Sequence, residues 1–184
     1  MISYYSEKGV NKLAENISSV TVDRIIINGG KKLYGDVYIE GMKNAALPII
    51  FATILTKSKC VIENLPPVTD IALSLKILSE MGATVNHIDE TTVEIDTTEF
   101  KYGTAPRNLV KKMRASTYLI GAELGRFCRA KVGFPGGCDF GVRPIDLHIK
   151  GFEALGATVN VSDDYICANA EDGLIGNHVF FDVA

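Results

Sequence analysis

The chain has 184 residues, of which 47% are hydrophobic and 22% charged, as in a globular protein large enough for a substantial core. Its net charge of −3 gives no reason to expect a nucleic acid or an anionic membrane as partner. The four cysteines form no CxxC pair and the three histidines are scattered, which favours a reduced, cytoplasmic protein without a metal centre, and neither a signal peptide nor a membrane span is expected.

The N-terminal part is predicted to be an extension followed by two strands. Residues 1–20 are polar and weakly patterned, and we expect a short helix near 10–17. Residues 22–28 and 34–40 have the composition and alternation of strands, with a glycine turn between them.

From residue 43 onward the sequence repeats itself. The segment Gly-Ala-Thr-Val-Asn occurs at 82–86 and again at 156–160, and each occurrence follows an amphipathic helical pattern. Gly82 and Gly156 are placed to end their helices in a left-handed conformation and to lead into a strand. The sequence therefore predicts two related structural units.

Each unit is predicted to contain a helix, a strand, a loop, a second helix and two strands. Such units cannot bury their apolar faces alone and must pack on one another, which predicts a mixed α/β (α+β) fold. The first unit spans about 43–100, with a helix at 44–56 and strands at 60–63 and 92–96. The second spans about 105–172, with a helix at about 107–126 and strands at 130–134 and 165–168.

After residue 172 the chain is predicted to begin one more strand, at 177–183, and the repeat pattern then stops. By the internal period, another helix would follow directly. We therefore expect the chain to be a fragment, with a third repeat that is only begun.

The run Pro-Gly-Gly-Cys-Asp-Phe-Gly-Val-Arg-Pro-Ile-Asp-Leu, residues 135–147, is the first candidate for chemistry. Its glycines permit a tight loop that presents Cys138. Arg143 places positive charge nearby, which favours the thiolate over the thiol and offers a bidentate partner for a phosphate. The competing interpretation is a glycine turn with an inert, buried cysteine.

Two further cations stand at predicted helix positions. Lys43 and Asn44 open the first helix, where backbone N–H groups attract anions, although a solvated lysine beside an asparagine N-cap is the simpler interpretation. Arg114 precedes a mainly apolar helical stretch and is expected to point inward. Its partner would then be either a phosphate or a carboxylate in a structural salt bridge.

The segment Arg143-Pro144-Ile145-Asp146 is predicted to start the next helix. Pro144 suits the first helical position, and a carboxylate at Asp146 is favoured by the helix dipole in the first turn. Asp146 could alternatively accept hydrogen bonds from a ligand.

Taken together and in this order, these motifs resemble those of the UDP-N-acetylglucosamine 1-carboxyvinyltransferases, within the enolpyruvyl transferase family. The likeness rests on Lys43-Asn44, Lys112-Met113-Arg114-Ala115-Ser116, Pro135-Gly136-Gly137-Cys138 and Arg143-Pro144-Ile145-Asp146-Leu147-His148. It implies an inside-out α/β barrel of three repeats in each of two domains, with the ligands in the cleft between the domains. It also implies transfer of the enolpyruvyl group of phosphoenolpyruvate to the 3′-hydroxyl of UDP-N-acetylglucosamine, the first committed step of bacterial peptidoglycan synthesis.

The resemblance implies a role for each matching residue. Lys43 would contact phosphoenolpyruvate, Asn44 would reach the sugar nucleotide, and Arg114 would bind near both substrates. Cys138 would protonate the methylene carbon of phosphoenolpyruvate, and is the cysteine that fosfomycin alkylates in this family. The uridine pocket would be lined by Arg143, which also holds the phosphate, and by Pro144, Ile145, Asp146 and Leu147. No metal or organic cofactor is expected.

The chain departs from the family pattern in its length. Members of the family are much longer, and residues 21–42 correspond to strands of a second domain that is nearly absent here. The aspartate expected to act as base on the sugar hydroxyl lies in that absent part, so we expect the isolated chain to be a poor catalyst or none, with the rest of the enzyme as its partner.

Three alternatives remain. The chain could be an inactive domain with residual UDP-sugar binding, a relative of 5-enolpyruvylshikimate-3-phosphate synthase, or a structural module. The Pro-Gly-Gly-Cys loop argues against the second, and the set of cations with a cysteine argues against the third.

Overall fold

The computed structural model describes residues 2–4, 25–27, 29–30, 32, 34–136 and 145–181, and the chain divides into two compact units, 1–39 and 40–184. In the first unit, β1 (Ile2–Tyr4) and β2 (Ile25–Ile27) form an antiparallel pair with Ile2 opposite Ile27. The centre of the strand predicted at 22–28 is thus confirmed. The helix expected near 10–17 lies outside the described residues.

The strand predicted at 34–40 does not form in this structure. Its alternating pattern is real, but Val37, Tyr38 and Ile39 are all more than 80% exposed. A strand needs a neighbour to satisfy its backbone hydrogen bonds, and no described segment pairs with these residues. Their assignment to a second domain therefore stays a prediction.

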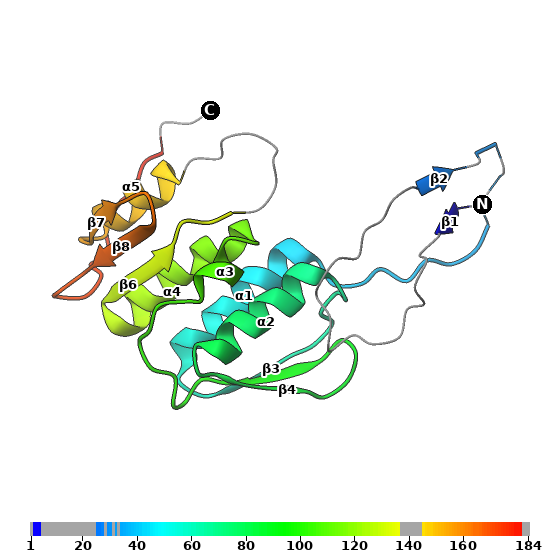
Figure 1. The fold of residues 1–184 in the computed structure, drawn as a ribbon, viewed down its shortest axis with the longest axis horizontal. Coiled ribbons are helices and arrows are strands. Elements are labelled where there is room, and N and C mark those ends of the chain that lie inside the picture. Colours follow the sequence, from blue (N-terminus) through cyan, green and yellow to red (C-terminus); the bar gives the residue numbers. More distant parts are fainter. Residues whose placement is uncertain are drawn as a thin grey trace. The chain divides into compact units, whose positions relative to one another are not determined.

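The first predicted repeat forms a three-stranded antiparallel sheet with two helices. Its elements are α1 (Lys43–Thr56), β3 (Lys59–Ile62), α2 (Thr69–Glu80), β4 (Thr84–His87) and β5 (Val93–Asp96). The strand order is β3-β5-β4, so the last strand lies between the other two. Figure 1 shows α1 and α2 on the same side of β3 and β4.

The second repeat reproduces this arrangement. Its elements are α3 (Arg107–Val110), the 3-10 helix η1 (Arg114–Thr117), α4 (Tyr118–Phe127), β6 (Arg129–Gly133), α5 (Asp146–Ala154), β7 (Thr158–Val161) and β8 (Tyr165–Asn169). The strand order β6-β8-β7 again places the last strand in the centre.

The strand registers show that the two repeats are equivalent residue by residue. In the first sheet, Asp96 lies opposite both Lys59 and Thr84. In the second, Asn169 lies opposite both Arg129 and Thr158. The threonine of the repeated Gly-Ala-Thr-Val-Asn segment therefore occupies the same place in both sheets, which confirms the predicted repeat.

The two repeated glycines end their helices in the same way. Gly82 has φ +103° and Gly156 has φ +91°, a left-handed region that favours glycine. The following alanine N–H then donates back into the helix, from Ala83 to the Leu78 carbonyl at 2.9 Å and from Ala157 to the Phe152 carbonyl at 3.0 Å. Both helix ends are therefore as predicted.

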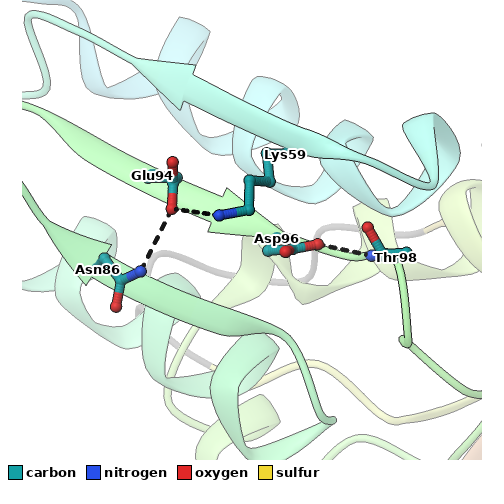
Figure 2. Close-up of polar contacts among 5 residues, drawn as sticks. All are labelled: Lys59, Asn86, Glu94, Asp96 and Thr98. Carbon is teal, nitrogen blue, oxygen red and sulfur yellow. Dashed lines mark hydrogen bonds and ion pairs between the residues drawn. The ribbon is translucent and has the colours of Figure 1, made fainter.

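The first sheet has one apolar face and one polar face. Val93 and Ile95 are buried, whereas the alternate side chain of Glu94 accepts hydrogen bonds from Lys59 at 3.4 Å and from Asn86 at 3.3 Å. On the same strand, the Thr98 backbone N–H donates to Asp96 at 2.9 Å and holds the pKa of that carboxyl below its ordinary value. Figure 2 shows these polar side chains together on the sheet.

The helix predicted at about 107–126 is divided in the structure. α3 ends at Val110, and η1 begins only at Arg114, after Met113 in an extended conformation (φ −144°, ψ 136°). Met113 is buried, and the Ser116 hydroxyl donates to the Met113 carbonyl at 2.9 Å. The break thus depends on burial and a local hydrogen bond, at a point where neither glycine nor proline marks a helix end.

The strand predicted at 177–183 is not present over its described part, 177–181. Instead, the segment follows the end of α5. The Ile175 N–H donates to the Leu155 carbonyl at 2.8 Å, and the Asn177 side-chain amide donates to the Ala154 carbonyl at 2.9 Å. These bonds satisfy carbonyls that the helix end leaves open.

A single hydrophobic core joins the repeats, because α1 packs against both α2 and α4. Arg126 of α4 adds polar links across the same boundary. Its guanidinium donates to the Ile54 carbonyl at the end of α1 and to the Thr97 carbonyl after β5, both at 2.8 Å. In the described part of the chain, none of the helices has the length and apolar character needed to cross a membrane.

Candidate functional site

Lys43 is the first residue of α1, and its N-cap is Met42 rather than Asn44. The Met42 backbone is extended, and its carbonyl accepts the N–H groups of Ala45 and Ala46 at 3.1 and 3.0 Å. The interpretation of Asn44 as a helix cap is therefore wrong, because the helix has already begun at Lys43. The Asn44 side chain is exposed.

Lys43 is not simply a solvated lysine. Its Nζ lies 2.7 Å from Oδ2 of Asp70, and the two side chains are 47% and 36% exposed. Asp70 belongs to the first turn of α2. The sequence offered no sign of this pairing beyond an acidic residue near a helix start, because the partners are brought together by the packing of α1 on α2.

Arg114 is the first residue of η1 and is half-buried, as an inward-pointing arginine would be. Its guanidinium makes no hydrogen bond or ion pair with another described residue. The alternative of a structural salt bridge therefore has no support within the described part of the chain.

Lys43 and Arg114 occupy equivalent places in the two repeats. α1 has 14 residues and ends before Lys57 in a left-handed conformation, and η1 with four residues and α4 with ten together end before Cys128 in the same conformation. Each run starts with the cation, directly after an N-cap methionine in an extended conformation, Met42 in the first repeat and Met113 in the second. The fold thus presents one cation at the start of each core helix.

Two glycines mark close backbone contacts beside these helix starts. A Cβ atom on Gly41 would lie 1.8 Å from the Asn64 carbonyl oxygen, and one on Gly136 would lie 1.7 Å from the Lys111 carbonyl oxygen. Only glycine fits at either position. The second contact brings the start of the 135–147 loop directly beside the segment that leads into Arg114.

The residues of the loop itself are only partly described. Cys138, Arg143 and Pro144 lie outside the described residues, so their predicted positions and roles stay predictions. After the loop, Ile145 is the N-cap of α5 and is buried, and Asp146 is exposed in the first turn, where the helix dipole favours a carboxylate. Leu147 lines a shallow apolar hollow with Phe152, Leu155 and Phe181.

The arrangement suits an anionic ligand. Lys43 and Arg114 come from two equivalent helix starts, where backbone N–H groups add positive potential, and the glycine contact at Gly136 ties the cysteine loop to one of them. Within the described residues no group of three or more histidine, cysteine or acidic side chains could hold a metal ion.

Comparison with known proteins gives relatives over most of the chain. A UDP-N-acetylglucosamine 1-carboxyvinyltransferase 2 of Clostridium acetobutylicum is 50% identical over 163 residues, 88% of this chain and 38% of the relative. A UDP-N-acetylglucosamine 1-carboxyvinyltransferase of Campylobacter fetus is 45% identical over 161 residues, with the same two coverages. The chain thus spans well under half the length of these relatives.

A solved structure supports the fold. The enolpyruvyl transferase NikO from Streptomyces tendae matches with a TM-score of 0.66 at 22% identity, over 79% of this chain and 32% of that one. The fold class predicted from the sequence is confirmed. The family model described as EPSP synthase (3-phosphoshikimate 1-carboxyvinyltransferase) matches residues 27–184, and the chain therefore belongs to this family.

Proposed function

We propose that this chain is the N-terminal part of an enzyme that transfers the enolpyruvyl group of phosphoenolpyruvate to the 3′-hydroxyl of UDP-N-acetylglucosamine. The observation that carries the choice of substrates is its 45–50% identity to enzymes named for that reaction. The equivalent placement of Lys43 and Arg114 supports a doubly anionic donor. The reaction would serve peptidoglycan synthesis in the cytoplasm, and through it cell shape and division.

The proposed reaction proceeds by addition and elimination, with a role for Cys138 and for the three cations. The Cys138 thiol gives its proton to the methylene carbon of phosphoenolpyruvate, and C2 develops oxocarbenium character. The sugar 3′-oxygen then bonds to C2 and loses its proton, forming a tetrahedral ketal. Loss of a methyl proton and of inorganic phosphate restores the double bond. Lys43, Arg114 and Arg143 would stabilise the phosphate and carboxylate charges throughout.

Other groups that the reaction needs would come from the rest of the enzyme and from the sugar-binding residues of this chain. The base for the sugar hydroxyl and further arginines would come from a second domain, to which residues 21–42 would also contribute strands. Asn44 and residues 143–147, including Pro144, Ile145, Asp146 and Leu147, would bind the sugar nucleotide. A ligand would reach the buried Ile145 through its backbone.

Phosphate release from phosphoenolpyruvate, dependent on UDP-N-acetylglucosamine, tests the proposal. In the natural polypeptide that contains this chain, Cys138→Ala should lower turnover by a factor of about 10² to 10⁴, the usual contribution of a general acid. Cys167→Ala is the matched control and should retain wild-type turnover, because Cys167 lies on β8 in the second sheet. Full activity in Cys138→Ala would contradict the role of the cysteine.

Fosfomycin provides an independent test of the loop. Mass spectrometry should find the adduct on Cys138, and not on Cys60, Cys128 or Cys167, which are all half-buried. Addition of EDTA should leave phosphate release unchanged, because no metal is assigned to the reaction.

The second candidate is a domain that binds the UDP-sugar without turnover. The share of the relatives' length that the chain spans, 38%, favours it for the isolated chain. Calorimetric titration with UDP-N-acetylglucosamine would then give binding, while phosphoenolpyruvate would release no phosphate.

A further inference from the structure

The ion pair between Lys43 and Asp70 connects the first residue of α1 to the first turn of α2. Its Nζ–Oδ2 distance is 2.7 Å, within the range of a strong charge-assisted hydrogen bond. Both side chains are substantially exposed, and exposed pairs of this kind contribute little to folding stability. The ion pair therefore matters mainly for the position of the Lys43 ammonium.

Backbone contacts fix the segments that lead into both members of the ion pair. The loop before α2 is anchored by Leu65, which is buried and whose N–H donates to the Thr91 carbonyl at 2.8 Å. One residue earlier, Asn64 has φ +57°, and its carbonyl packs directly against Gly41, two residues before Lys43. The carboxylate and the ammonium are thus presented by two chain segments in direct contact.

A lysine at this position needs such a partner more than an arginine does. Its ammonium sits on a flexible stem, and the positive end of the α1 dipole repels it. The guanidinium of Arg114, at the equivalent place in the second repeat, is planar and has a preorganised set of donors, and no described carboxylate pairs with it.

We propose that Asp70 is a positioning residue that holds the Lys43 ammonium at the start of α1, ready to donate to the phosphate or carboxylate of an anionic substrate. This inference rests on the proposed function. An ammonium has three donors, so Lys43 can keep its bond to Asp70 while it donates to the ligand. Asp70 itself does not touch the substrate in this arrangement.

Steady-state kinetics of the natural polypeptide that contains this chain provide the first test. Asp70→Asn should lower kcat/KM for phosphoenolpyruvate about tenfold, the loss expected when one positioned charge interaction is removed. The KM for UDP-N-acetylglucosamine should not change. Asp70→Glu, which keeps the carboxylate, should recover part of the loss.

A double-mutant cycle separates positioning from a general structural effect. If Asp70 acts through Lys43, the variant Lys43→Met/Asp70→Asn should be no slower than Lys43→Met alone. Glu94→Gln is the matched control, because it removes the exposed Lys59–Glu94 pair of the same repeat, seen in Figure 2, and should leave the kinetics unchanged. Multiplicative losses in the double variant, or wild-type kinetics in Asp70→Asn, would overturn the proposal.

A measurement on the 184-residue chain itself keeps the two proposals distinguishable. At low temperature, proton exchange of the Lys43 ammonium, measured from its ¹H–¹⁵N signal, should be as slow in Glu94→Gln as in the wild type and faster in Asp70→Asn, because the pairing with Asp70 slows exchange. Absence of turnover in the wild-type polypeptide would contradict the proposed function alone. A Lys43 exchange rate that is unchanged in Asp70→Asn would refute the positioning role, whatever the activity.

Discussion

At the scale of single residues, Glu123 is the most unusual group in the described structure. Its side chain is fully buried in α4. One carboxylate oxygen accepts the Lys131 N–H of β6 at 3.1 Å, and the other has no hydrogen-bond partner among the described residues. Burial raises the pKa of this carboxyl from 4.5 to about 8, so it is mainly protonated in the folded protein at neutral pH.

The raised pKa predicts a loss of stability at alkaline pH. Between pH 4.5 and about 8 the unfolded chain ionises Glu123 while the folded chain keeps the proton, so the free energy of unfolding falls as pH rises through this range. A shift of this size corresponds to a loss of up to about 5 kcal/mol. Urea unfolding at pH 5, 7 and 9 should show this decline in the wild type.

Glu123→Gln is the test of this cause, because glutamine keeps an acceptor for the Lys131 N–H and does not ionise. Its unfolding free energy should vary much less between pH 5 and 9 than that of the wild type. Parallel curves for the two proteins would show that another group produces the pH dependence.

At the scale of elements, Arg126 is the main polar link between the repeats. Besides the carbonyls of Ile54 and Thr97, it donates to the Phe100 carbonyl at 3.0 Å, and its guanidinium lies 5.2 Å from the Phe127 ring centroid. One side chain thereby joins the end of α1, the end of β5 and α4. A planar guanidinium reaches these acceptors from two separate nitrogens in a fixed fork, whereas all three donors of an ammonium lie on a single nitrogen.

Replacement of Arg126 should therefore destabilise the packing of one repeat on the other. Arg126→Ala should lower the free energy of unfolding by about 3 kcal/mol or more, because several carbonyls lose their donor, and Arg126→Lys should recover little. Arg129→Ala, which removes a guanidinium that stacks on Tyr102 at 4.2 Å, should cost about 1 kcal/mol and is the control. Equal losses in chemical denaturation would contradict the linking role of Arg126.

At the scale of the whole molecule, the segment 34–39 exposes several large apolar side chains. Tyr34, Val37, Tyr38 and Ile39 are 87%, 81%, 93% and 86% exposed, and they follow one another closely. Clustered exposed apolar side chains of this kind usually belong to an interface. We expect the chain to bind the dye ANS, and the triple variant Val37→Ser/Tyr38→Ser/Ile39→Ser to bind it much less.

Isolated apolar side chains provide the control for this prediction. Val61 and Ile88 are 54% and 58% exposed at separate places, and their replacement by serine should barely change ANS fluorescence. If the 37–39 variant fluoresces like the wild type, the apolar cluster is not the dye-binding surface.

Much of the fold follows from local sequence patterns. The repeated Gly-Ala-Thr-Val-Asn segment predicted two equivalent helix–strand junctions, and both have the expected left-handed glycine. The break at Met113 could not be predicted, because the residues on both sides have good helical periodicity and the extended backbone depends on burial. The strand expected at 34–40 and the described part of the one expected at 177–183 did not form, because a strand forms only beside a partner.

The residues of the candidate site were likewise only partly predictable from the sequence. Lys43, Asn44, Arg114, Cys138 and Arg143 could be selected from their order along the chain, since the motifs are contiguous. Asp70 could not, because it lies far from Lys43 in the sequence and is brought to it by the packing of α1 on α2.

The sequence by itself determined the repeat, the ends of the repeated helices and the family, because all three depend on residues that are close neighbours in the chain. Only the tertiary structure decided that Lys43 and Arg114 are equivalent, that Lys43 pairs with Asp70, and that Glu123 is buried with one oxygen that no described residue hydrogen-bonds. These features depend on contacts between elements, and such contacts exist only once the helices have packed on one another and on the sheets.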